Sequence, residues 1–198
     1  MTSSAGSAAL GDRVRLPLRF DVAQMCADVD ALALREFIYY DVLPLTAPAH
    51  LVDPSRPPPS TDCNDYADGT WTEWLDTGAL NEASYLRSVV ETFRAHTRVT
   101  LVRLLRLEPG AVVQEHTDPT LGLDVPDSVI RLTVPIVSPE EVCFLLNGSP
   151  VPMQPGECWY LRLCDPHAIT NGSAVVRVNL TIDMEPNAWV RALLADAV

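Results

Sequence analysis

The sequence predicts a mainly β fold, a barrel or jelly roll with flanking helices. From residue 99 onward, apolar and polar residues alternate with a period of two in short segments that turn signals separate. Before residue 99, two segments instead show the spacing of amphipathic helices. Several short strands that follow helices are typical of a barrel or jelly roll. We expect one domain over residues 13–198, since this length suffices for a single core and no repeat is evident.

The N-terminal part should contain a tail, a strand and a helix. Residues 1–12 are rich in Ser, Ala and Gly and are expected to form a flexible tail. Val14–Phe20 alternates as a strand, and Pro17 places it at a sheet edge because proline cannot donate to a ladder. Asp21 is a suitable cap for a helix whose apolar residues are Met25, Val29 and Leu32.

Residues 40–80 differ in character from the rest of the chain. They hold several prolines and Asp68-Gly69, which predicts a long and mostly irregular segment. Tyr66, Trp71 and Trp74 argue against full disorder, since aromatic side chains favour burial. Such loops are commonly functional. The segment is therefore either a lid or wall of a substrate pocket, or a structural wrap over a sheet.

One further helix and six strands are expected beyond this segment. Asn81 should cap an amphipathic helix over Glu82–His96. Asn147-Gly148 is a strong signal for a two-residue hairpin turn. The predicted strands are Val99–Leu107, Ala111–His116, Val129–Ile136, Glu141–Leu146, Glu157–Leu163 and Ala174–Met184.

The charge balance excludes some partners. The chain has 14 basic and 26 acidic residues and a net charge of −12. Phosphate backbones and anionic membranes attract basic surfaces, so we expect neither a nucleic-acid partner nor membrane association. All the basic residues are arginine, which is typical of codon bias in a GC-rich bacterium. A small-molecule or peptide substrate remains as the expected partner, and no pattern indicates an oligomeric state.

The cysteines suggest a reducing compartment. Cys26, Cys63, Cys143, Cys158 and Cys164 are odd in number and lack the pair spacing of zinc sites. We interpret them as small buried apolar residues rather than as metal ligands or redox-active thiols. No signal peptide or transmembrane run is evident. These features together favour a cytoplasmic protein.

Two histidines and an aspartate form the most informative pattern in the chain. His116 and Asp118 lie at the end of an expected strand, where residues i and i+2 share a face. His167 follows downstream, between a proline and an Asn-Gly turn. Alone, the HxD pair is better explained as a surface ion pair, and His167 as a polar loop residue. Together they match the two-histidine, one-carboxylate ligand set of non-haem Fe(II) oxygenases.

Arg177 lies in the last expected strand, ten residues after His167. Arg177, Asn179 and Thr181 share one face of that strand, and apolar residues occupy the other. An arginine inside a barrel needs an anion, because a buried unpaired charge is costly. We expect Arg177 and Asn179 to bind a carboxylate cosubstrate. The alternative is an ordinary amphipathic strand whose polar face meets solvent.

Three more residues are candidates for the pocket wall. Arg131 and Thr133 share a face of their strand, and we expect Arg131 to contact an anion inside the barrel. Arg103 and Arg106 lie on opposite faces of another strand, so at most one faces the pocket. Arg103 is equally compatible with the pocket and with the surface.

These motifs resemble those of the aspartyl/asparaginyl β-hydroxylase family. The stretch RLLRLEPGAVVQEHTD, from Arg103 to Asp118, resembles the family's arginine-rich strand, Pro-Gly turn and HxD motif. Further along, RLTVP, FLLNG, GECWY, PHAITN and RVNLTID resemble successive family motifs. The resemblance extends over about residues 80 to 190 and is far more specific than HxD alone.

The resemblance implies a double-stranded β-helix of cupin type that uses Fe(II), O₂ and 2-oxoglutarate. His116, Asp118 and His167 would be the iron ligands. Arg177 would hold the distal carboxylate of 2-oxoglutarate. Arg131 matches a family arginine near the inner carboxylate of the cosubstrate and the carboxylate of the substrate. The chain keeps the ligand Asp118, which disfavours halogenation because no coordination position is left for chloride.

Two residues depart from the family pattern. Thr133 stands where the family usually has histidine, and Arg162 stands where members often have aspartate. Thr133 alters the substrate side of the pocket, and Arg162 is either surface charge or a new substrate contact. The expected activity is hydroxylation of an unactivated C–H in an amino acid or a peptide residue, in bacterial secondary metabolism. A cupin-type zinc hydrolase or lyase and a non-catalytic acid-binding module are alternatives, although the zinc enzyme leaves Arg177 unexplained.

Overall fold

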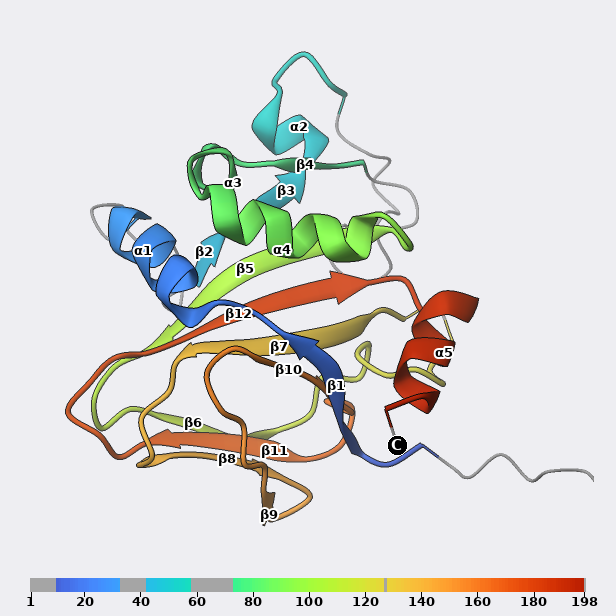
Figure 1. The fold of residues 1–198 in the computed structure, drawn as a ribbon. Coiled ribbons are helices and arrows are strands. Elements are labelled where there is room, and N and C mark those ends of the chain that lie inside the picture. The colour runs from blue at the N-terminus through green and yellow to red at the C-terminus, as the bar shows by residue number, and fades with distance from the viewer. Residues whose placement is uncertain (1–9, 33–41, 58–72, 127, 198) are drawn as a thin grey trace, which may run out of the picture.

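The computed structural model describes residues 10–32, 42–57, 73–126 and 128–197. Two antiparallel sheets face one another, as in a double-stranded β-helix (Figure 1). The larger sheet has the strand order β1 (Arg13–Arg19), β10 (Glu157–Leu161), β7 (Ile130–Val137), β12 (Arg177–Met184), β5 (Val99–Leu107) and β2 (Val42–Pro44). The smaller has the order β6 (Val112–His116), β11 (His167–Asn171), β8 (Val142–Leu146) and β9 (Ser149–Pro150). The predicted fold class is confirmed.

A small apolar cluster lies between the two sheets. Trp159 and Leu161 from β10 pack with Phe144 and Leu146 from β8, and Ile169 of β11 joins them. These strands alternate, so their inward side chains form this cluster while the others face away. The cluster fills one part of the barrel interior and leaves the polar faces of β12, β7 and β5 for the site.

The N-terminal strand and helix agree with the sequence. β1 lies at the edge of the large sheet, and Pro17 falls where its pairing with β10 is irregular, between Arg15 and Arg19, so a missing N–H is tolerated there. Helix α1 covers Val22–Leu32. The Asp21 carboxylate accepts a hydrogen bond from the backbone N–H of Gln24 at 3.1 Å, as a helix cap does. Both predictions are confirmed.

The predicted start of the long helix is wrong. Asn81 belongs to a separate short helix, α3 (Gly78–Glu82), and α4 begins afterwards as Ser84–Arg94. No side chain of its own caps α4. Two backbone N–H groups in its first turn instead donate to the Asp28 carboxylate of α1, both at 2.8 Å. A cap supplied by another helix cannot be seen in the local sequence.

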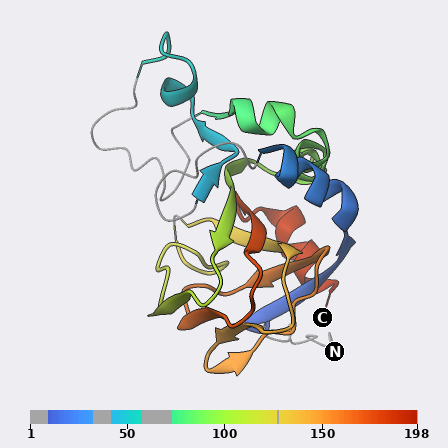
Figure 2. The same ribbon diagram turned by 90° about the vertical axis from the view of Figure 1, so that its left-hand side faces the viewer.

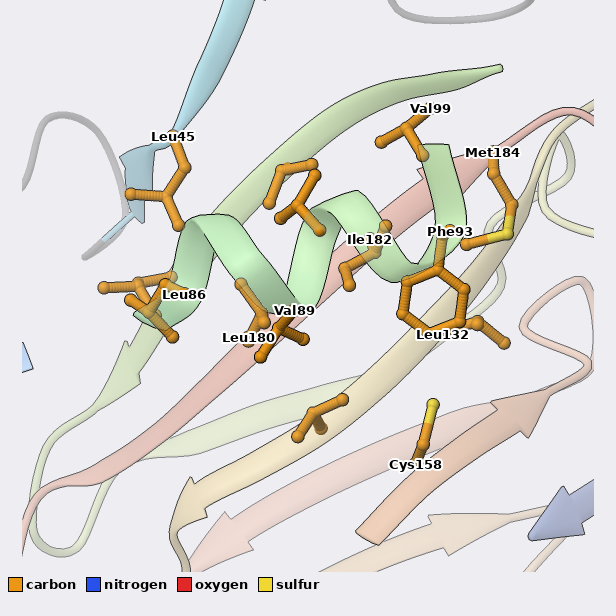
Figure 3. Packing of buried hydrophobic residues seen from close by; sticks show 14 of the residues in the cluster. Leu45, Leu86, Val89, Phe93, Val99, Leu132, Cys158, Leu180, Ile182 and Met184 are labelled. Carbon is orange, nitrogen blue, oxygen red and sulfur yellow. The ribbon is translucent and has the colours of Figure 1, made fainter. Parts of the chain in front are cut away.

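The main core lies between the large sheet and α4. Leu86, Val89 and Phe93 form one stripe of the helix and point at the sheet (Figure 3). Leu180 and Ile182 of β12 meet them from below and are fully buried. Packing of this kind on one face of the large sheet leaves its other face free to line the site. Figure 2 shows that the small sheet lies at the opposite end of the molecule from α1 and α4.

The segment over residues 40–80 contains more regular structure than expected. Its described parts form β2, β3 (Thr46–Pro48), α2 (Ala49–Val52), β4 (Trp74–Asp76) and α3. Thr46 is fully buried, and its hydroxyl donates to Thr100 O at 2.7 Å and accepts from Val102 N at 2.7 Å. This part therefore wraps the edge of the large sheet. Residues 58–72 lie outside the described residues, as do residues 1–9 of the predicted tail.

The C-terminal third differs from the sequence prediction in three places. Residues 167–171 were expected in a loop but form β11, which pairs with both β6 and β8. The last strand begins at Arg177 rather than at residue 174. A final helix, α5 (Ala188–Ala195), was not predicted, although Asn187 caps it through a hydrogen bond from Val190 N at 2.9 Å. Among the described residues, no helix is both long and apolar enough to span a bilayer.

The predicted hairpin at Asn147-Gly148 is confirmed. It joins β8 to β9, which pair in antiparallel fashion. Both turn residues have positive φ, 50° for Asn147 and 70° for Gly148. A type I′ turn needs positive φ at both of its central positions, and Asn-Gly adopts this conformation most readily.

Candidate functional site: a metal and carboxylate pocket

The three predicted metal ligands meet at one end of the small sheet. His116 on β6 lies directly across from His167 on β11, and their ring centroids are 4.2 Å apart. Asp118 follows β6, and its backbone N–H donates to Leu163 O at 2.8 Å. One ligand atom from each of the three residues lies within 4.8 Å of the others. The register of one strand pair thus brings the two histidines together, and the Leu163 contact places Asp118 beside them.

Backbone carbonyls orient both imidazoles. Nδ1 of His116 lies 2.8 Å from Gln114 O, and Nδ1 of His167 lies 3.0 Å from Asp165 O. A carbonyl can only accept, so each Nδ1 carries the proton and each Nε2 keeps its lone pair for a metal. Burial lowers the pKa of His167, which favours the neutral form that binds metal. Two imidazoles and a carboxylate therefore fit a facial metal site with open positions.

Arg177 is a buried cation with donors to spare. It is 2% exposed, and its Nε has no hydrogen-bond partner among the described residues. Burial lowers its pKa to about 10. With the Asn179 amide oriented so that its oxygen faces Arg177, Asn179 Oδ1 accepts from Nη1 of Arg177 at 3.1 Å and also from Nη2. Because no described carboxylate pairs with Arg177, the group suits an anionic ligand.

Arg131 lies in the pocket, as expected, and is held by the protein's own carboxylates. Its Nε and Nη2 donate to the two oxygens of Asp183, both at 2.7 Å. Its Nη1 donates to Asp118 Oδ2 at 3.4 Å. The predicted contacts of Arg131 with cosubstrate and substrate stay predictions, and its internal partners compete with them.

Arg103 faces the pocket, and Arg106 does not share that face. Arg103 pairs in register with Thr181, which in turn pairs with Thr133, so the three form one row across the large sheet. The Nε of Arg103 is buried without a hydrogen-bond partner among the described residues. Burial and the nearby charge of Arg131 lower the pKa of Arg103 to about 10. Arg106 instead pairs with Glu108 near the end of β5.

Arg162 lies in a turn beyond the end of β10 and is 41% exposed at its side chain. It forms an ion pair with Asp165 at 2.7 Å. The backbone carbonyl of Asp165 is the group that orients His167. In this structure Arg162 therefore braces the turn before a metal ligand, and its predicted substrate contact stays a prediction.

Sequence reasoning overlooked Asp183. This residue is 2% exposed and follows Arg177, Asn179 and Thr181 at alternate positions of β12, so it shares their face. It also stands in the RVNLTID motif. The alternation could have placed it in the pocket, but its pairing with Arg131 depends on the register between β12 and β7.

Comparison with known proteins agrees with this arrangement. The model of the aspartyl/asparaginyl β-hydroxylase family matches residues 62–186, more than half of the chain. The chain belongs to this family. It is therefore an Fe(II)/2-oxoglutarate-dependent oxygenase by family, and its His-Asp-His cluster and buried arginine suit those two groups. None of the curated proteins compared matches the chain.

Solved structures of oxygenases share the fold of this β-hydroxylase family member. A 2-oxoglutarate–Fe(II) oxygenase family protein from Burkholderia pseudomallei is 16% identical, with a TM-score of 0.54 over 89% of this chain and 85% of that one. The viral collagen prolyl hydroxylase of Paramecium bursaria Chlorella virus-1 is 10% identical, with a TM-score of 0.52 over 88% and 96%. The non-haem α-ketoglutarate-dependent carbocyclase from nogalamycin biosynthesis is 15% identical, with a TM-score of 0.54 over 88% and 80%.

Proposed function

We propose that this oxygenase hydroxylates an unactivated C–H bond of an amino acid or of an amino-acid residue in a peptide. His116, Asp118 and His167 would hold Fe(II), and Arg177 with Asn179 would hold the distal carboxylate of 2-oxoglutarate. The observation that carries the proposal is the pairing of a three-ligand cluster with a buried, carboxylate-free guanidinium inside the same barrel. A metal hydrolase would have no use for that second feature.

The residues of the chain position and enclose the reactants. When bound, Fe(II) and 2-oxoglutarate supply C–H oxidation by O₂ coupled to decarboxylation of the cosubstrate to succinate. Arg177 fixes one end of the cosubstrate through a charge-assisted contact, and Asn179 keeps the guanidinium in place. Phe144, whose ring stacks on His167 at 6.0 Å, helps to exclude water from the metal side.

The charge balance of the pocket supports a substrate with a carboxylate. The described pocket residues include three guanidinium groups, those of Arg103, Arg131 and Arg177, and two carboxylates, those of Asp118 and Asp183. Fe(II) and the 2-oxoglutarate dianion cancel each other. One positive charge is left over, and Arg103 is a guanidinium near the metal ligands with an unused donor. The carboxylate of an amino acid would neutralise it.

We also propose the cytoplasm of a bacterium as the setting of the reaction. Cys26, Cys143, Cys158 and Cys164 are free thiols, and a reducing cytoplasm keeps both thiols and Fe(II) reduced. The arginine-only basic composition and the small barrel favour a bacterial tailoring enzyme. The acidic net charge is consistent with a small-molecule or peptide substrate rather than nucleic acid.

Anaerobic titration of the Fe(II)-loaded protein with 2-oxoglutarate tests the proposal. We expect a weak visible charge-transfer band in the wild type, no band in His167→Ala, and a band that needs far more 2-oxoglutarate in Arg177→Ala. Amino acids and peptides are then screened for succinate release that depends on O₂, with Arg103→Met as the variant expected to lose substrate affinity. Bound metal without any band would refute the oxygenase assignment for this chain.

A further inference from the structure

Asp183 is the buried carboxylate to which the proposed reaction gives no role. It lies on β12 directly opposite Arg131 on β7, so the register of two central strands sets the pair. Both carboxylate oxygens accept from the guanidinium at 2.7 Å, a two-point charge-assisted contact. Such a pair is rigid because it depends on the sheet and not on a loop.

Asp118, by contrast, lies beyond the end of β6 and is partly exposed. The remaining nitrogen of Arg131, Nη1, reaches its Oδ2 at 3.4 Å, while the other oxygen accepts no hydrogen bond from a described residue and is free to bind metal. A carboxylate outside the sheet can rotate unless another group restrains it. The only described charged group bonded to this carboxylate is Arg131.

We propose that Asp183 and Arg131 act as one positioning unit that fixes the Asp118 carboxylate for metal binding. Asp183 anchors and neutralises the guanidinium, and Arg131 presents its third nitrogen to the metal ligand. Arg131 is then a positioning residue for the metal ligand Asp118. Arg131 stays bonded to Asp183, because leaving it would bury that carboxylate with no partner, which is strongly unfavourable.

This assignment sharpens substrate recognition, and in that respect it rests on the proposed function. With Arg177 used by the cosubstrate and Arg131 bonded to two carboxylates of the protein, Arg103 is the guanidinium of the three with no carboxylate of its own and no cosubstrate role, and we assign the substrate anion to it. The two arginines are neighbours in the pocket, since the charge of Arg131 helps to lower the pKa of Arg103. A substrate with one carboxylate near the reacting carbon fits better than a dianion that would need both guanidinium groups.

Metal binding measured without turnover tests the unit. Co(II) absorption is titrated for the wild type, Asp183→Asn, Arg131→Gln and the double variant Arg131→Gln/Asp183→Asn, together with the unfolding free energy of each metal-free protein. The double variant replaces a buried ion pair by two neutral amides, so it should fold even where a single variant does not. Asp124→Asn is the control, because Asp124 is exposed and bonds only to Arg191 among the described residues.

We expect Co(II) affinity to fall about tenfold or more in the double variant, because loss of a group that hydrogen-bonds to a metal ligand commonly has an effect of this size. The unfolding free energy of the double variant should stay near that of the wild type. The single variants that fold should lose a similar amount of Co(II) affinity, because the effects of mutating residues that act as one unit are not additive. Wild-type Co(II) affinity in a stably folded double variant would overturn the proposal. If the wild-type Co(II) protein binds no 2-oxoglutarate, the oxygenase proposal fails while the Co(II) comparison still decides this one.

Discussion

Individual residues in this pocket handle buried charge in two ways. Arg131 is balanced within the protein by Asp183 and Asp118. Arg177 is more deeply buried than Arg131 but has only the neutral amide of Asn179 beside it. A buried guanidinium without a carboxylate lowers the stability of the ligand-free fold. The protein tolerates that cost at Arg177, which is understandable if an anion arrives there during function.

Asn179→Asp should have opposite effects on the ligand-free protein and on the protein with 2-oxoglutarate bound. A carboxylate next to Arg177 would neutralise the buried guanidinium, so the ligand-free protein should become more stable. The same carboxylate would repel the cosubstrate, and 2-oxoglutarate affinity should fall roughly tenfold or more, about 1.4 kcal/mol or greater. Thermal unfolding and 2-oxoglutarate titration of the Co(II) protein measure the two effects. Asn81→Asp, at an exposed position of α3, should change neither. A variant that gains stability and keeps full 2-oxoglutarate affinity would contradict this assignment of Arg177.

Asp12 should contribute to acid unfolding. Its hydrogen bonds from Arg13 lower its pKa from 3.8 to about 2, and Asn147 also donates to it at 3.0 Å. A carboxyl group with a lowered pKa in the fold stabilises the protein above its unfolded pKa. That contribution is lost as the pH falls from about 4 to about 2. Because the pair is partly solvated, we expect at most about 1 kcal/mol. Denaturant unfolding of the wild type and Asp12→Asn should differ at pH 6 and converge near pH 2; a constant difference would exclude the linkage.

Helices and strands could be predicted where the sequence pattern within and beside them is enough to define them. β5 has the predicted bounds, because its apolar, β-branched start and the Pro109-Gly110 turn that follows it are both local signals. The start of α4 was wrong because Asp28, far away in sequence, supplies its cap. β11 was missed because its short run, His167–Asn171, carries polar residues on both faces that only the paired strands explain. Asn171, for example, donates to Leu107 O at 2.9 Å and to Val175 O at 2.8 Å.

Asp28→Ala should loosen the contact between α1 and α4. The Asp28 carboxylate satisfies two N–H groups at the positive end of α4, so its loss should cost about 1–2 kcal/mol of unfolding free energy. Chemical denaturation measures the change. The control is Asp30→Ala, an exposed position in the same helix. Metal affinity should stay that of the wild type, because Asp28 lies in the layer on the other side of the large sheet. A change no larger than that of Asp30→Ala would contradict the capping role.

At the scale of the whole molecule, the site belongs to both sheets. The metal ligands could be predicted because the chain has only four histidines, and an HxD pair followed by a further histidine is a distinctive pattern. The partner of Arg131 and the orientation of Arg103 could not, because both depend on the register among β5, β12 and β7. His116 and His167 come from the small sheet, whereas Arg177 and Asn179 come from the large one. A ligand that reaches both groups would therefore connect the two sheets.

Ligand-dependent stability follows from this division. A divalent metal should stabilise the fold by itself, and 2-oxoglutarate should add to this only when the metal is bound, because its two ends then contact different sheets. At a hundred times the dissociation constant, each step is worth about 2.7 kcal/mol, or roughly 5–10 °C in Tm at about 2–4 °C per kcal/mol. Thermal unfolding with a chelator, with Co(II), and with Co(II) plus 2-oxoglutarate measures both steps. His167→Ala should lose the stabilisation by Co(II) and that by 2-oxoglutarate. Arg177→Ala should keep the stabilisation by Co(II) and lose most of that by 2-oxoglutarate. An equal 2-oxoglutarate shift in the chelated protein would mean that the acid binds elsewhere, and the two sheets would not be joined through the metal.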